Sequence, residues 1–367
     1  MKSDVYYIDF ETRMGRGILD KFSLLFERAG LNKIFNKGDL VALKVHVGQP
    51  GSATFVPHVY AGRAVSLIRE GGGNPFLTDA NTLYTGGRSN AVDHTRTAAV
   101  HGFNLESCGA PFLVADGLHG HEYQDVPVEG EYIKKARIAA AIVQADSLVA
   151  LSHFKGHEVC GFGGAFKNLG MGCASRAGKQ IQHSDIHPGV RDERCISCGA
   201  CLRWCPVSAI TMEKKAHIDE QLCIGCAECL VACRSGAIGI NWKEGAAGST
   251  QRKVVEYAAA VLKDKKERCG FVNFLMNVTP FCDCYDGSGN FLVPDIGILA
   301  SRDPVAIDQA SVDLVNAAPR LPGTRGEKNS SSDVFEAAHE GISWRPQIEH
   351  AEKMGLGSRD YRLIKVE

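Results

Sequence analysis

The sequence carries almost no net charge and has no long run of apolar residues. Its 41 lysines and arginines are balanced by 42 aspartates and glutamates, which leaves a formal net charge of -1. Without a basic excess or a basic block, it lacks the electrostatic field typical of nucleic-acid-binding proteins. Its apolar runs are far shorter than the ~20 residues that span a bilayer. The N-terminal residues also lack the apolar core of a secretory signal, so we expect a cytoplasmic protein that binds neither nucleic acid nor membrane.

Cysteine is the residue that stands out in this composition. Apolar residues make up 44% of the 367 residues, which is typical of a folded protein, and there are 14 cysteines. The length suits one large domain with a smaller module, or two to three ordinary domains. In an intracellular protein, closely spaced cysteines indicate metal or redox chemistry rather than disulfides.

Strand-like and helix-like segments alternate over residues 1–188 and again over 250–367, with a cysteine-dense segment at 189–243 between them. This rhythm predicts an α/β main domain, a sheet covered by helices, with a small α+β domain inserted into it. The expected strands are 4–10, 40–47, 75–78, 111–115, 147–151, 271–278 and 296–299. The expected helices are 18–35, 59–69, 132–145, 253–262 and 305–317.

The inserted segment contains two cysteine runs of the same spacing. The first is Cys195-x2-Cys198-x2-Cys201-x3-Cys205-Pro206, and the second is Cys223-x2-Cys226-x2-Cys229-x3-Cys233. A zinc site would need two separated Cys-x2-Cys pairs rather than two doubled runs. In the bacterial two-cluster pattern, the fourth cysteine of each run ligates the other cluster. We therefore assign one [4Fe–4S] cluster to Cys195, Cys198, Cys201 and Cys233, and the second to Cys223, Cys226, Cys229 and Cys205. Residues 190–241 closely resemble the bacterial-type ferredoxin family.

A second group of polar residues precedes these cysteines. Between residues 153 and 183, three histidines, three lysines and two cysteines lie among several glycines. The phosphate-loop and dinucleotide-binding patterns both fail on spacing. Lys167 is the cation best placed for an anionic substrate, while His157 and His183 are candidate acid/base groups or metal ligands. Lys44 and His46, at the end of an expected strand, are assigned to the same pocket.

Three further positions have alternative interpretations. Cys282 and Cys284, separated by one residue, could bind a third metal with Cys160, Cys173 or Cys269, form a redox-active pair, or be inert buried thiols. Asp79 follows an expected strand, where open α/β sheets usually hold ligands. Asp303, which precedes Pro304, is expected to cap a helix.

The whole chain resembles the domain-of-unknown-function family 362. The resemblance is carried by Lys44-x-His46, Lys167-Asn168-Leu-Gly, the ferredoxin-like insertion and Asp303-Pro304-Val-Ala-Ile-Asp308. It implies an α/β fold and iron–sulfur binding, and no established reaction.

Part of the chain is more distantly similar to the nickel-pincer lactate racemases. Gly156-His157, Lys167 and His183 follow the His–Lys–His order of that family. In that family the lysine carries the pincer cofactor, and the histidines serve as nickel ligand and proton-transfer groups. By position, the resemblance implies these roles for Lys167, His157 and His183.

These observations favour an iron–sulfur redox protein, either an oxidoreductase or an electron-transfer component. Its two [4Fe–4S] clusters would pass low-potential electrons to or from a pocket lined by Lys44, His46, His157, Lys167 and His183. We expect a redox partner protein, a small anionic substrate, and an additional metal or anionic ligand in the α/β domain. The alternatives are a pure electron carrier that docks to a partner enzyme, and a racemase-like, metal-dependent catalyst with accessory clusters.

Overall fold

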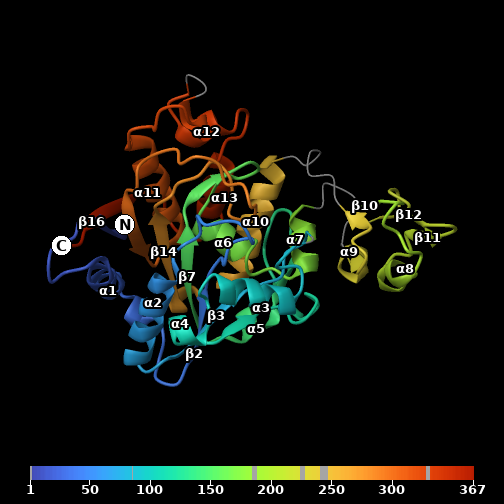
Figure 1. Cartoon of the computed structure of the whole chain (residues 1–367), viewed down its shortest axis with the longest axis horizontal. Helices are drawn as coiled ribbons and strands as arrows, with labels where there is room; N and C mark the ends of the chain where they lie inside the picture. The colour runs from blue at the N-terminus through green and yellow to red at the C-terminus, as the bar shows by residue number, and fades with distance from the viewer. Residues whose placement is uncertain (1, 85, 184–187, 224–227, 240–246, 328–330) are drawn as a thin grey trace.

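A mixed sheet of eight strands, flanked by helices, forms the centre of the protein (Figure 1). The computed structural model describes residues 2–84, 86–183, 188–223, 228–239, 247–327 and 331–367. The strands of the sheet are β1 (Ser3–Ile8), β2 (Leu40–Lys44), β3 (Asn74–Asp79), β4 (Phe112–Val114), β7 (Ser147–His153), β14 (Cys269–Leu275), β15 (Gly297–Ser301) and β16 (Tyr361–Lys365). Their order is β16-β1-β15-β14-β7-β2-β3-β4, and within it only β15 runs antiparallel to its neighbours.

Both faces of the sheet are buried, because successive side chains of a strand point to opposite faces. In β2, Val41 and Leu43 belong to one apolar cluster and Ala42 belongs to the other. The first cluster includes residues of α1 (Ile18–Arg28), α2 (His58–Glu70), α3 (Ala91–Val100) and α4 (Leu105–Cys108). The second includes residues of α5 (Ala140–Gln144), α6 (Ala165–Gly170), α10 (Ala247–Leu262), α11 (Pro304–Ala317), α12 (Val334–Ala338) and α13 (Arg345–Lys353). None of the described helices is long and apolar enough to cross a bilayer.

The cysteine-rich segment forms a small unit beside the sheet domain (Figure 1). Its elements are β10 (Gly189–Val190), α8 (Ala200–Trp204), β11 (Ile210–Met212), β12 (Ala216–Ile218), α9 (Glu228–Ala232) and β13 (Ile238–Gly239). β10 pairs with β13, so the chain enters and leaves this unit at adjacent strands, and β11 pairs with β12. Apolar residues and cysteines of the unit form an apolar cluster that also includes Leu83 of the main domain. Helix α7 (Arg176–Gln182) of the main domain contacts α9.

The helix expected over residues 132–145 is wrong. This segment contains the strand β6 (Lys135–Ala139), which pairs antiparallel with β5 (Tyr123–Pro127), and only its last residues form α5. Ala136 and Ile138 are buried at alternate positions of β6, as in a strand with one face packed, and the pairing with β5 fixes this conformation. The Glu256 carboxylate of α10 accepts the backbone N–H groups just before this strand.

The helix expected over residues 18–35 is interrupted. Helix α1 ends at Arg28, and a short 3-10 helix, Leu31–Lys33, follows it. Between them Gly30 has φ of 70°, a conformation that glycine adopts at little cost. The other expected helices and strands correspond to described elements within a few residues, and Asp303 caps α11 as expected, accepting N–H bonds from Val305 and Ala306.

A buried carboxylate fixes the helix that carries Lys167. Asp308 of α11 accepts the backbone N–H of Ala165 at 2.7 Å and that of Phe166 at 3.1 Å, at the start of α6. It also accepts the side-chain amide of Asn273 at 2.7 Å. A Cβ at Gly164 would lie 2.3 Å from the Asp308 carboxylate, so glycine is required there. Burial raises the pKa of Asp308 to about 6.

Replacing Asp308 by alanine should destabilise the protein by about 3 kcal/mol or more, because three buried donors lose their acceptor. Asp308→Asn, which retains one acceptor oxygen, should lose less. Urea unfolding of both variants measures this difference. Gln309→Ala, at the neighbouring position of α11, is the matched control and should change the free energy of unfolding by less than about 0.5 kcal/mol. Equal losses for Asp308→Ala and Gln309→Ala would contradict the anchoring role.

Candidate functional site

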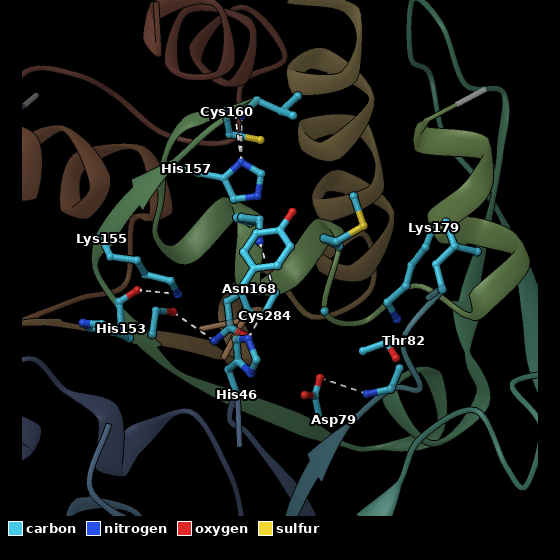
Figure 2. Close-up of a pocket in the computed structure, with 18 of the residues that line it drawn as sticks. His46, Asp79, Thr82, His153, Lys155, His157, Cys160, Asn168, Lys179 and Cys284 are labelled. Carbon is cyan, nitrogen blue, oxygen red and sulfur yellow. Dashed lines mark hydrogen bonds between the residues drawn. The ribbon is translucent and has the colours of Figure 1, made fainter. Parts of the chain in front are cut away.

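A cavity of about 410 Å³ lies at the carboxyl ends of β2, β3 and β7 (Figure 2). Ligands of open α/β sheets bind at this edge. The loop after β3, the segment around α6 and α7, and the loop after β14 complete its wall. The ionisable side chains that line it are Lys44, His46, Asp79, Tyr84, Arg88, His153, Lys155, His157, Glu158, Cys160, Lys167, Lys179, His183, Cys284 and Tyr285.

A buried ion pair joins two neighbouring strands at the base of the cavity. Lys44 Nζ, at the end of β2, lies 3.0 Å from Asp79 Oδ1, at the end of β3. The same ammonium group donates to the side-chain oxygen of Asn168 at 2.7 Å, which connects the strands to α6. Burial alone would raise the pKa of Asp79, but Lys44 and His94 outweigh it and hold this pKa well below its usual value. Asp79 is therefore a fixed anion that holds Lys44 in place.

Two cysteines, a histidine and a lysine meet at one side of the cavity. Cys282 Sγ and Cys284 Sγ lie 2.8 Å apart, and His46 Nε2 lies 3.4 Å from Cys284 Sγ. The Lys167 ammonium lies 3.3 Å from the first sulfur and 3.9 Å from the second. Among the described residues, His46, Cys282 and Cys284 form the one group of three potential metal ligands whose ligand atoms all lie within 4.8 Å of one another. The third member is therefore His46, not Cys160, Cys173 or Cys269.

The electrostatics of this group favour a thiolate beside an ammonium ion. Hydrogen bonding to Cys282, together with Lys167 and His46, lowers the pKa of Cys284 well below its ordinary value, whereas hydrogen bonding to Cys284 and burial raise that of Cys282. Burial alone would lower the pKa of Lys167, but the two sulfurs raise it well above its ordinary value. Lys167 therefore stays charged.

Asp283, the residue between the two cysteines, makes its contacts on the side of the loop opposite to the two thiols. Asp283 is fully buried, and its carboxylate accepts from Thr54 at 2.8 Å and lies 2.7 Å from His153 Nδ1. Lys155 Nζ lies 3.6 Å from the same carboxylate. Burial opposes the charge of Asp283, but His153 and Lys155 overcome it and lower its pKa. These contacts fix the backbone that carries both thiols.

His157 and His183 are neutral imidazoles in the cavity wall. Burial lowers the pKa of His157 to about 4 and that of His183 to about 3. His157 Nδ1 accepts the backbone N–H groups of Val159 and Cys160, both at 3.1 Å, so its proton is on Nε2. Neutral imidazoles can accept a proton from a bound substrate or ligate a metal.

The cavity has more cationic than anionic groups. Lys44, Arg88 and Lys155 lie within 4 Å of a carboxylate. In the described part of the chain, Lys167 and Lys179 form no ion pair with a carboxylate; Lys179 donates to the carbonyl of Ala174 at 2.6 Å. Burial lowers the pKa of Lys179 to about 8. An anionic ligand would offset this cationic excess.

The five pocket residues expected from the sequence all line this one cavity. Lys44 and His46 come from the end of β2, Lys167 from α6, His157 from β8 (Lys155–His157), and His183 from the residue that follows α7. Their catalytic roles remain predictions.

Two wall residues were missed by the sequence analysis. Arg88 is 2% exposed and donates to the Tyr84 hydroxyl at 2.7 Å. That hydroxyl in turn donates to the Cys284 carbonyl at 3.1 Å. Both residues lie in the loop after Asp79, which was itself identified, so the polar segment following that strand was the available signal.

Four of the eight module cysteines line a small separate cavity. These are Cys195, Cys198, Cys201 and Cys233, the set expected to share a cluster. Of the other set, Cys205, Cys223 and Cys229 belong to the apolar cluster of the module, and Cys226 lies outside the described residues. The assignment of clusters to these cysteines remains a prediction.

The cysteine module contacts the wall of the main cavity. Leu83 lines the main cavity and also belongs to the apolar cluster that contains the module cysteines. Its carbonyl accepts from Arg176 of α7 at 3.2 Å. The ring of Trp204, on the module, lies 5.0 Å from that of His121 on the main domain. The module therefore packs beside the cavity rather than on the far side of the sheet.

Comparisons with known proteins give a family and several distant structural likenesses, two of which follow. The family model described as a domain of unknown function, DUF362, matches residues 41–313. The apoprotein of lactate racemase from Thermoanaerobacterium thermosaccharolyticum is 14% identical, with a TM-score of 0.39, over 75% of this chain and 51% of that one. A Thermotoga maritima protein solved by a structural genomics consortium is 10% identical, with a TM-score of 0.40, over 72% and 52%. The chain thus spans about half the length of these two proteins. No curated protein matches it.

Replacing Lys179 should change the free energy of unfolding by an amount that depends on pH. Because its folded pKa of about 8 lies below that of a free lysine, the unfolded chain binds the proton more tightly, and the folded protein gains stability as pH rises above 8. Between pH 7 and pH 9.5, the free energy of unfolding of the wild type should therefore rise by about 2 kcal/mol relative to that of Lys179→Met. Urea unfolding at both values measures this gain. Lys37→Met, at an exposed position, should show no such change, and a constant difference for Lys179→Met would contradict the shift.

Proposed function

Since the chain belongs to the DUF362 family, whose description names no activity, we propose a function from its own site. It is an iron–sulfur oxidoreductase in which a small anionic substrate binds in the lysine-rich cavity and exchanges electrons with the cysteine module. The observation that carries this proposal is Leu83, which is shared between the cavity wall and the apolar cluster of the module. Electron transfer between a cofactor and a substrate requires such proximity.

The donor set of the module fits iron–sulfur clusters. Cys195, Cys198, Cys201 and Cys233 would hold one [4Fe–4S] cluster, and the cavity that they line supports this assignment. Cys205, Cys223, Cys226 and Cys229 would hold the second. When bound, such clusters supply one-electron redox chemistry at a potential set by their surroundings. A redox partner protein would exchange electrons at the exposed face of the module, where Ile196 and Leu222 present apolar side chains to solvent.

The cavity residues would bind and orient the substrate. Lys167 and Lys179 supply positive charge that no carboxylate of the described residues neutralises, while Lys44 is held by Asp79 and Asn168. His157 and His183 are neutral at pH 7; His157 Nε2–H can donate to the substrate, and the neutral His183 can accept a proton from it. Reductions at carbon or sulfur add protons together with electrons. The cavity histidines would handle the protons, and the cysteine module would exchange the electrons.

A redox-neutral reaction is the second candidate. The two neutral imidazoles line the same cavity, so one could remove a proton from a bound substrate and the other could return it. Such a racemase-like reaction would proceed without iron, whereas the oxidoreductase would lose turnover together with its iron.

Metal analysis tests the module directly. The chain purified without oxygen should contain about eight iron and eight acid-labile sulfide per molecule. The reduced wild type should give the paramagnetic resonance signal of [4Fe–4S] clusters. Cys201→Ser should lose about half of the iron. Cys108→Ser, a buried cysteine outside the module, is the control and should keep all of it. Zinc in place of iron would overturn the proposal.

Ligand binding tests the cavity. Succinate should raise the melting temperature by a few degrees, because a ligand that binds only the folded state stabilises it. Its neutral isostere succinamide should not. Lys167→Met should abolish most of the effect, and Lys37→Met should keep it. Equal stabilisation by succinate and succinamide would contradict an anionic substrate.

A further inference from the structure

Two thiols lie side by side at the cavity wall, and they differ in access. Cys284 lines the cavity and is half-buried, whereas Cys282 lies behind it with no exposed surface. The contacts of Asp283 with Thr54 and His153 hold the intervening residue on the opposite side of the loop. Both sulfurs therefore face the same side, 2.8 Å apart.

The protonation of His46 distinguishes a thiol pair from a metal site. In a metal-binding imidazole the second ring nitrogen carries a proton, and this N–H donates a hydrogen bond to an acceptor. Here that nitrogen, Nδ1, faces two groups that can only donate, namely the Gly48 backbone N–H at 3.2 Å and the Arg88 guanidinium at 3.3 Å. Nδ1 therefore accepts, and the proton of the neutral ring is on Nε2, where it points to Cys284 Sγ. An Nε2–H donates to a thiolate and offers no lone pair to a metal.

Lys167 adds a second argument against a metal ion. Its ammonium group lies within 4 Å of both sulfurs and, in the described residues, has no carboxylate partner. A divalent cation bound to the same sulfurs would be repelled by this charge, whereas a thiolate is stabilised by it.

We propose that Cys282 and Cys284 form a redox-active dithiol/disulfide pair that exchanges with a disulfide bound in the cavity. Cys284 is the nucleophile and Cys282 is the resolving thiol. His46 is a positioning residue that keeps Cys284 in its thiolate form. This inference needs no iron, and it stands or falls independently of the clusters.

The exchange balances in two steps. The Cys284 thiolate attacks one sulfur of the bound disulfide, whose S–S bond breaks, and a mixed disulfide forms as the first half leaves as a thiolate. Cys282 then attacks Cys284 Sγ, and the second half leaves and takes the proton of Cys282, so that it is released as a thiol. The protein pair loses two electrons and one proton, and the substrate gains them.

The test uses the full chain, reduced and freed of reductant without oxygen, with dithiodipropionate as a small dianionic disulfide. After an acid quench, free thiols are alkylated and the peptide that contains both cysteines is analysed by mass spectrometry. We expect this peptide to lose both alkylation sites together, with release of two mercaptopropionates per chain and full reversal by dithiothreitol. The wild-type result needs no variant, so it is independent of folding effects.

Variants assign the two roles. Cys282→Ser should trap a mercaptopropionate on Cys284, and Cys284→Ser should react at least tenfold more slowly than the wild type. His46→Ala should move the pH profile of Cys284 alkylation upward by about one unit. Cys269→Ala, a buried cysteine of β14 upstream in the chain, is the control and should react like the wild type.

Two outcomes would overturn the proposal. If both cysteines stay alkylatable after prolonged exposure to the disulfide, they are inert. The group is a metal site if one equivalent of Zn²⁺ binds the reduced chain and blocks alkylation of both cysteines, and if the His46→Ala variant no longer binds this Zn²⁺.

Discussion

The buried ion pair between Lys44 and Asp79 is the interaction on which the site depends. A lysine that is 1% exposed must be paired, because an isolated charge costs several kcal/mol away from water. Asp79 provides that partner from the adjacent parallel strand, and Asn168 adds a hydrogen bond from α6. Two strand ends and one helix are thereby fixed relative to one another. Asp308 fixes the start of the same helix, so Lys167 is carried by an element that is held both at its first residues and at Asn168.

This rigidity explains how several positively charged side chains can line one cavity. Lys44, Arg88 and Lys155 have carboxylate partners, and their positions are set whether or not a ligand is present. Lys167 is paired instead with sulfur, and Lys179 is bonded to a backbone carbonyl. The three cations with carboxylate partners are thus structural, while the positive charge of Lys167 and Lys179, which form no ion pair with a carboxylate of the described residues, is available to a ligand. The cavity is organised before binding, which lowers the ordering cost of the bound state.

The sequence predicts the α/β class and the contents of the cavity better than it predicts individual elements. Lys44, His46 and Asp79 could be placed because strand ends of a parallel sheet share one edge. The helix expected at 132–145 fails because Ala136 and Ile138 are apolar in a pattern compatible with both periods, and pairing with β5 decides between them. The meeting of His46 with Cys284 could not be predicted, since 238 positions separate them and only the packing of two loops brings them together. Arg88 follows Asp79 by nine positions, so the polar loop after that strand was the signal by which it could have been found.

The electron capacities of the proposed dithiol pair and of the proposed clusters would match. A dithiol changes its redox state by two electrons, and two [4Fe–4S] clusters bound to the module would together hold two, one each. The family match at residues 41–313 includes both the cysteine module and the loop with Cys282 and Cys284, and Leu83 lies between the module and the cavity. A cavity that served only as a docking surface would not need a polarised thiol pair, a buried arginine and two neutral imidazoles. In the proposed function, chemistry at the cavity accounts for the cost of burying these groups, and the module would serve as its neighbouring electron store.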